Sequence, residues 1–183
     1  MKKLTLTIVA FLGLFVGAMA QTATHGVDIT INSVAMIRAS SFLGGTAANS
    51  GFTVGAPTTA GAIPSTTEAS TNVLYLQYTS IKTATGTPRT IKAVLSGTNP
   101  AGLSITAIAA TPTGGTGDVG ITNDVQTLSP TAATMIKNIG SGYTGTENGK
   151  GANITYGSTI TAMADLKVTA ATALTVTYTL STE

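Results

Sequence analysis

Residues 174–180 read Leu-Thr-Val-Thr-Tyr-Thr-Leu, and this stretch decides the fold class. Its apolar side chains occupy the even positions and its threonines the odd ones, so an extended chain would point the two sets to opposite faces. A helix would scatter both sets around its circumference. Threonine is also β-branched and suits a pleated strand. The stretch therefore predicts a half-buried β-strand.

The same two-residue period recurs along the chain and predicts further strands. They are expected at residues 27–31, 72–78, 89–95, 103–109, 153–156 and 164–168. Segment 72–78 is apolar on both parities, which favours a central strand covered on both faces. The apolar parity changes between Ile31 and Val34, which predicts a bulge or bend near Asn32 and Ser33.

Turn residues separate these strands. Asn99-Pro100-Ala101-Gly102 is a turn signal that predicts an antiparallel hairpin between segments 89–95 and 103–109. Glycine-rich loops are expected at 44–71, 111–124 and 140–151; the length of the first predicts either a short strand at 52–54 inside it or a mobile part. Residues 132–139 are a weak helical or irregular candidate. Together, about seven short strands predict an all-β fold, an antiparallel β-sandwich, with a β-barrel as the alternative.

The N-terminal residues have the pattern of a secretory signal peptide. Lys2 and Lys3 precede an apolar run over residues 4–16, and Ala18-Met19-Ala20 is a small-x-small cleavage pattern. The run is shorter than the roughly 20 residues that span a bilayer. A buried N-terminal helix is the simpler alternative. The prediction is a signal peptide over residues 1–20 and a single β-sandwich domain over 21–183, exported and without membrane insertion after cleavage.

Charge and composition exclude several partners. Charged residues make up 9% of the chain, against about 25% in typical soluble domains. Loss of Lys2 and Lys3 with the leader leaves seven basic and seven acidic residues, a formal net charge of zero. The basic residues are scattered rather than clustered, which excludes nucleic acid as a partner. A low net charge instead tolerates close packing with copies of the same chain.

The residues offer little for catalysis. The one histidine, His25, lies near the predicted mature N-terminus, a poor place for a base. Asp118 and Asp124 could serve acid–base chemistry or bind calcium, but two acids fall short of a calcium loop, and turns favour aspartate. The glycines from Gly114 lack the lysine of a phosphate loop. No catalytic, cofactor or metal site is predicted, and the protein is expected not to be an enzyme.

Four stretches carry a resemblance to known proteins. They are His25-Gly26-Val27-Asp28-Ile29-Thr30-Ile31, Pro100-Ala101-Gly102-Leu103-Ser104-Ile105-Thr106, Ile139-Gly140-Ser141-Gly142-Tyr143-Thr144-Gly145 and residues 174–180. They resemble small secreted β-proteins encoded by Bacteroidota. The resemblance implies a Gram-negative exported protein of the periplasm, cell surface or medium, and it implies no catalytic residues.

A looser likeness is to fimbrial subunits. Those proteins carry an alternating N-terminal segment that completes a neighbour's fold by strand addition, and Val27, Ile29 and Ile31 could play that part here. The chain departs from the pattern because it has no cysteine, and the glycine and near-terminal aromatic at the C-terminus are not matched. The simpler alternative is that Val27, Ile29 and Ile31 belong to the first strand of a self-contained sandwich.

The leading functional expectation is an exported structural or interaction protein of the cell surface, in its finer form a self-associating fibre or pilin-like subunit. Its partners would be copies of itself or other surface proteins. The alternative is a secreted module that binds a sugar or another surface polymer through the loops around Gly114 and Tyr143, the latter being the tyrosine that lies in a predicted loop. A secreted hydrolase is the third alternative.

Overall fold

The structure is a computed structural model that describes residues 26–41, 50–68 and 74–182. The chain divides into two units, Met1–Ile31 and Asn32–Glu183. In the first unit the described residues, 26–31, lie outside any strand. The predicted signal peptide and His25 lie outside the described residues.

In the described part of the second unit the regular secondary structure is β-strand, apart from one 3-10 turn. Seven strands have seven or more residues: β1 (Val34–Ser41), β4 (Leu74–Ile81), β5 (Arg89–Ser96), β6 (Leu103–Ala109), β10 (Ala133–Ile139), β12 (Ala152–Ile160) and β13 (Thr175–Thr182). The shorter ones are β2 (Phe52–Gly55), β3 (Ser65–Glu68), β7 (Thr116–Gly117), β8 (Ile121–Thr122), β9 (Gln126–Thr127) and β11 (Gly142–Tyr143). A single 3-10 turn, η1 (Met163–Asp165), joins β12 to β13 among the described residues.

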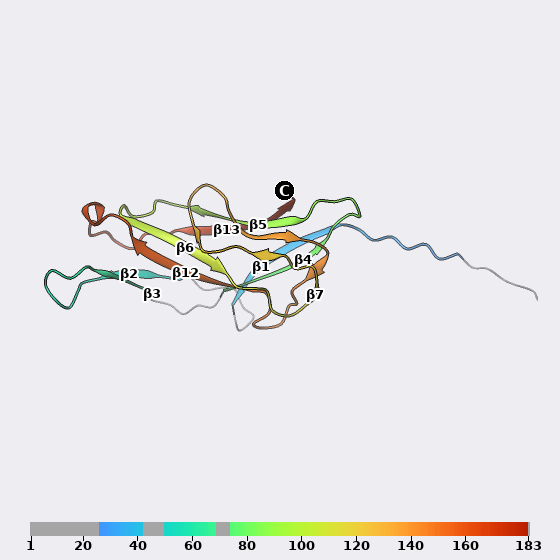
Figure 1. The fold of residues 1–183 in the computed structure, drawn as a ribbon, viewed down its shortest axis with the longest axis horizontal. Helices are drawn as coiled ribbons and strands as arrows, with labels where there is room; N and C mark the ends of the chain where they lie inside the picture. Colours follow the sequence, from blue (N-terminus) through green and yellow to red (C-terminus); the bar gives the residue numbers. More distant parts are fainter. Residues whose placement is uncertain (1–25, 42–49, 69–73, 183) are drawn as a thin grey trace, which may run out of the picture. The chain divides into compact units, whose positions relative to one another are not determined.

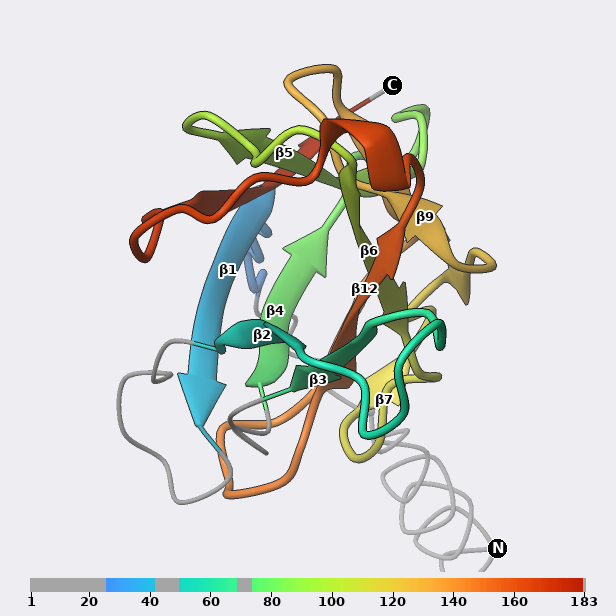
Figure 2. The same ribbon diagram turned by 90° about the vertical axis from the view of Figure 1, so that its left-hand side faces the viewer.

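The strands form two main antiparallel sheets. The larger sheet has the order β7-β11-β4-β12-β6-β9, with β1 also paired to β4, and Figure 2 shows β1, β4, β12 and β6 side by side. The smaller sheet has the order β13-β5-β10-β8, and Figure 1 shows β13 and β5 next to each other. A separate hairpin, β2–β3, lies against β12, where the Thr66 Oγ1 donates to the Ser158 carbonyl at 2.7 Å. Both main sheets keep open edges, so the β-sandwich prediction is confirmed and the closed barrel is wrong.

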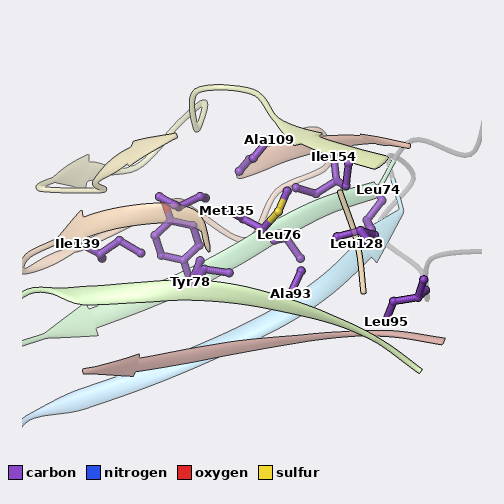
Figure 3. Packing of buried hydrophobic residues seen from close by; sticks show 14 of the residues in the cluster. Leu74, Leu76, Tyr78, Ala93, Leu95, Ala109, Leu128, Met135, Ile139 and Ile154 are labelled. Atoms are coloured by element: carbon purple, nitrogen blue, oxygen red, sulfur yellow. The ribbon is translucent and has the colours of Figure 1, made fainter. Parts of the chain in front are cut away.

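The core lies between the two sheets. Alternating side chains of β4 and β5 point into it, including Leu76, Tyr78, Ile91 and Ala93, and Met135 of β10 fills the space between them (Figure 3). Fully burying a large apolar side chain contributes about 1.5–3 kcal/mol. The chain contains no cysteine, so this apolar contact holds the sheets together without a disulfide.

Three tyrosines place their hydroxyls in or against this core: Tyr78 is buried, and Tyr156 and Tyr178 are partly buried. The hydroxyls of Tyr156 on β12 and Tyr178 on β13 lie 2.8 Å apart and link the two sheets. The Tyr78 hydroxyl donates to the Val119 carbonyl at 2.6 Å. Burial raises the pKa of Tyr178, and the neighbouring Tyr156 raises it further. Burial also raises the pKa of Tyr78, with a smaller rise from the Asp118 carboxylate.

The connection between β5 and β6 differs from the sequence prediction. Both strands form as expected, but β5 pairs with β13 and β10 in the smaller sheet, while β6 pairs with β12 and β9 in the larger one. The turn at Asn99–Gly102 therefore carries the chain from one sheet to the other, and the predicted hairpin is wrong. A local turn signal indicates a change of direction but not the partner of the next strand.

Two further predictions are wrong. Residues 132–139 contain the strand β10, in which consecutive residues Met135 and Ile136 are both buried and the pairing with β5 shifts register twice. Asn138 also has a positive φ of 58°. These irregularities hide the two-residue period. Conversely, segment 164–168 alternates without forming a strand: it lies in η1 and the following loop, and Val168 is exposed.

The predicted loops contain short strands. Phe52–Gly55 forms β2 as the sequence indicates, and it pairs with β3, which the sequence did not indicate. Residues 111–124 contribute β7 and β8, and residues 140–151 contribute β11. Each of these three strands is two residues long, too short to give a periodic signal.

The buried tyrosines predict a loss of stability in alkali. A folded-state pKa above the unfolded value of about 10 means that the unfolded chain releases the phenolic proton more readily. Stability should therefore be fully present below about pH 10 and fall as pH rises above it. Tyr178→Phe should weaken this dependence and cost about 1 kcal/mol at neutral pH through the lost hydroxyl pair. Urea unfolding followed by circular dichroism across the pH range checks this, and an unchanged alkaline slope in Tyr178→Phe would contradict it.

Candidate interaction surfaces

The segment ahead of the sandwich exposes a row of apolar side chains. Val27, Ile29 and Ile31 are 73%, 82% and 76% exposed, and residues 26–33 belong to no strand. The prediction of a half-buried strand at 27–31 is therefore wrong. The expected bulge or bend is also absent: Asn32 and Ser33 lie in no strand or turn, and β1 pairs with β4 in continuous register from Val34 onward.

Ser33 is fixed where this segment meets the sandwich. Its Oγ donates to the Ile81 carbonyl of β4 at 2.9 Å and accepts from the Arg89 Nη2 of β5 at 2.8 Å. Arg89 is buried, and its Nε has no hydrogen-bond partner among the described residues. No sequence motif indicates this contact, because Ser33 and Arg89 are far apart along the chain. It ties the beginning of β1 to both sheets at one end of the sandwich.

The last strand, β13, is an edge strand of the smaller sheet. It pairs with β5 along its whole length and has no partner on its other side among the described strands. Its inward side chains, Val176, Tyr178 and Leu180, are only half-buried. Their direct neighbours on β5 are buried: Leu95, Ala93 and Ile91. The inward side chains of β13 are thus more exposed to solvent than those of its neighbour β5.

Tyr143 lies on a sheet surface rather than in a loop. It pairs with Thr79 of β4 on one side and with Thr116 of β7 on the other. Met36 of β1 also pairs with Thr79, so Met36, Thr79, Tyr143 and Thr116 form one row across four strands. Because Tyr78 and Ser80 point into the core, this row is on the outer face. Tyr143 is 48% and Met36 67% exposed.

A polar cluster beside this row was not predicted from the sequence. The Arg38 Nε donates to the Gln77 Oε1 at 2.6 Å, and its Nη2 donates to the Thr146 carbonyl at 3.0 Å. The Gln77 Nε2 donates to the carbonyls of Glu147 and Lys150 at 2.8 and 3.1 Å. These bonds hold the loop after Tyr143 against the outer face of the larger sheet.

The carboxylates considered for catalysis or calcium are not grouped. Within the described ranges, no cluster of three or more His, Cys, Asp or Glu side chains could hold a metal ion. The Asp118 side chain packs against Gly140, and the Asp118 carbonyl accepts from the Gly140 amide at 3.0 Å. The Asp124 carbonyl accepts from the Gln126 Nε2 at 2.8 Å. Gly114 lies against the Lys150 side chain.

No helix of the described chain has the length and hydropathy needed to cross a membrane.

Gly115 allows the backbone beside β7 to approach Tyr143 of β11 closely. Its φ is +68°, and an added Cβ would lie 1.7 Å from the Tyr143 carbonyl oxygen. Gly61 is a matched control, because its φ is +86° but nothing lies within 4 Å of an added Cβ. Gly61→Ala should lose about 1 kcal/mol from the positive φ alone. Gly115→Ala should lose about 1–3 kcal/mol more, because the backbone must move apart. Urea unfolding of both variants measures the difference, and equal losses would show that β7 does not approach β11 so closely.

The chain was compared with protein-family models, curated proteins and solved structures. No family model, curated protein or solved structure matches the chain.

Proposed function

We propose that this chain is an exported structural protein of a Gram-negative cell surface that associates with copies of itself by strand addition, as a fibre subunit. The observation that carries the proposal is the exposed apolar row of Val27, Ile29 and Ile31 outside any strand. An unpaired segment with alternating apolar side chains is what strand addition to another sheet requires.

Energy and charge support the same proposal. Transferring three large aliphatic side chains from water into an apolar site contributes roughly 5 kcal/mol before the costs of ordering the segment. The chain beyond the predicted leader has a formal net charge of zero, so little long-range repulsion opposes association. The outward positions of β13 are threonines, which fit a sheet that extends from one copy to another.

Replacing the apolar row should prevent assembly without unfolding the sandwich. In the variant Val27→Thr, Ile29→Thr, Ile31→Thr the segment keeps its β-branched character but loses most of its apolar surface. Wild-type mature protein should form filaments in electron micrographs and large species in sedimentation velocity, whereas the variant should stay monomeric with an unchanged unfolding midpoint.

The matched control removes a similar apolar area elsewhere. Ile63, Met163 and Val168 are exposed at 76%, 50% and 107% and lie outside the segment. The variant Ile63→Thr, Met163→Thr, Val168→Thr should assemble like the wild type. If the control loses assembly equally, nonspecific hydrophobic contact explains the association. Monodisperse wild-type monomers, with no filaments on producing cells, would refute the proposed function.

A second candidate function is a module that binds a sugar or another surface polymer. It is favoured by the exposed Tyr143 ring, which pairing on both sides holds on the outer face beside Met36. Aromatic side chains on a rigid sheet provide apolar contact with a polar tip. A glycan array should show ligands for the wild type that Tyr143→Ala loses at least about tenfold. A blank array, or equal binding by both proteins, would remove this candidate.

A further inference from the structure

The side of the sandwich that carries β13 also carries β1. The two edge strands are adjacent, and Figure 3 shows both along the same side of the core. They run in opposite directions, because Val34 at the start of β1 pairs with Ile81, while Thr182 at the end of β13 pairs with Arg89. Ser33 accepts a hydrogen bond from Arg89, the β5 residue that pairs with Thr182, so the start of β1 and the end of β13 lie at the same end of the sandwich. We call this the anchored end of the sandwich.

The two edges offer different surfaces to an added strand. The inward side chains of β13 are Val176, Tyr178 and Leu180, a row of large apolar groups that is still half-exposed. On β1 the inward positions include Ala35, Ile37 and Ala39, of which Ile37 alone is a large apolar group. Cross-strand contacts between aromatic and β-branched residues are among the stabilising ones in sheets. An added apolar strand would therefore bury more apolar surface on β13 than on β1.

Segment 26–31 and strand β13 each carry three large apolar residues, spaced two positions apart. In an antiparallel register that places Ile29 opposite Tyr178, Val27 is opposite Leu180 and Ile31 is opposite Val176. The outward positions then pair Asp28 and Thr30 with threonines. Antiparallel pairing is also slightly more stable than parallel pairing.

This pairing cannot be made within one chain. Ile31 is two residues from Ser33, a span of roughly 7 Å. Ser33 is held at the anchored end, near Thr182, whereas the register requires Ile31 beside Val176, roughly 20 Å away along β13. In this register the strand therefore comes from a second copy.

We infer that residues 26–31 of one copy add antiparallel to the free edge of β13 in the next copy, with Val27, Ile29 and Ile31 covering Leu180, Tyr178 and Val176; this inference rests on the proposed self-association. The donor's Ile31 leaves the acceptor at the end opposite its anchored end. The acceptor's own segment starts from the anchored end. Each added copy therefore presents a new free segment, a head-to-tail contact that propagates as a filament.

Addition to β1 has a different consequence. An antiparallel strand on β1 would bring the donor's Ile31 to the acceptor's own anchored end, beside Ser33. Two copies could then exchange segments reciprocally and form a closed dimer. The acceptor strand thus decides between a filament and a dimer, and a single experiment can identify it.

The test uses engineered cysteines, since the chain has none. The inferred register places Thr30 opposite Thr177, and both are exposed and point outward. Opposite residues in an antiparallel pair have Cα atoms about 4.5–5.5 Å apart, within disulfide range. The mature protein with Thr30→Cys and Thr177→Cys, oxidised in air, should give a ladder of multimers on a non-reducing gel that collapses on reduction.

Two controls accompany this variant. Thr30→Cys alone can form at most a disulfide-linked dimer. Thr30→Cys with Met36→Cys places the second thiol on the outer face of β1 and should not produce a ladder. If wild-type filaments form but the Met36 pair cross-links instead, or neither pair does, the β13 acceptor is wrong while the proposed function stands. If the wild type does not associate at all, both are wrong.

Hydrogen exchange provides a second measurement without changes in β13. Backbone amides gain protection when they enter a ladder. Filaments of the wild type, compared with the monomeric variant Val27→Thr, Ile29→Thr, Ile31→Thr, should show slower exchange in residues 26–31 and in β13. Exchange in β1 should be unchanged. Protection that appears in β1 and spares β13 would overturn the inference.

Discussion

Apolar contact between two antiparallel sheets holds this molecule together, and the quality of that contact changes across the sandwich. In its interior Leu76, Ile91 and Met135 are at most 1% exposed. Along β13 the inward side chains are only half-buried, because no further strand covers them among the described residues. A sheet edge combines unpaired backbone groups with incompletely covered side chains, and natural proteins usually protect such edges. The same chain contains, in residues 26–31, an unpaired segment with apolar residues at the same two-residue spacing.

Much of the fold could be predicted from the two-residue period. Strands β5, β6, β12 and β13 lie where alternating apolar residues indicated them, because each has one face on the core; β4 was indicated by a segment that is apolar on both parities. The period failed for β10, whose bulges bring consecutive residues inward, and it misled at 164–168, where alternation occurs without a partner. Which strands pair with one another was harder to predict than where the strands lie. Whether β5 and β6 share a sheet depends on the whole set of strands, and no local pattern contains that information.

The candidate surfaces could be predicted only in part. Val27, Ile29 and Ile31 are recognisable from their spacing, but the spacing is the same for a buried strand and for an exposed donor. Their exposure became evident only in the structure. Tyr143 was expected in a loop because glycines surround it, yet those glycines allow β7 and β11 to approach closely. The contacts of Arg38 and of Arg89 join residues distant in sequence, so no motif could indicate them.

The link between Ser33 and Arg89 has a mechanical consequence. A pull on the segment ahead of β1 reaches the sandwich first at Ser33, which is bonded to both sheets. The tension then runs lengthwise along β1, whose ladder bonds to β4 are perpendicular to it. All the bonds of the ladder would have to yield together, instead of opening one after another as in a peeled strand. A sandwich built in this way resists traction through geometry, without a covalent cross-link.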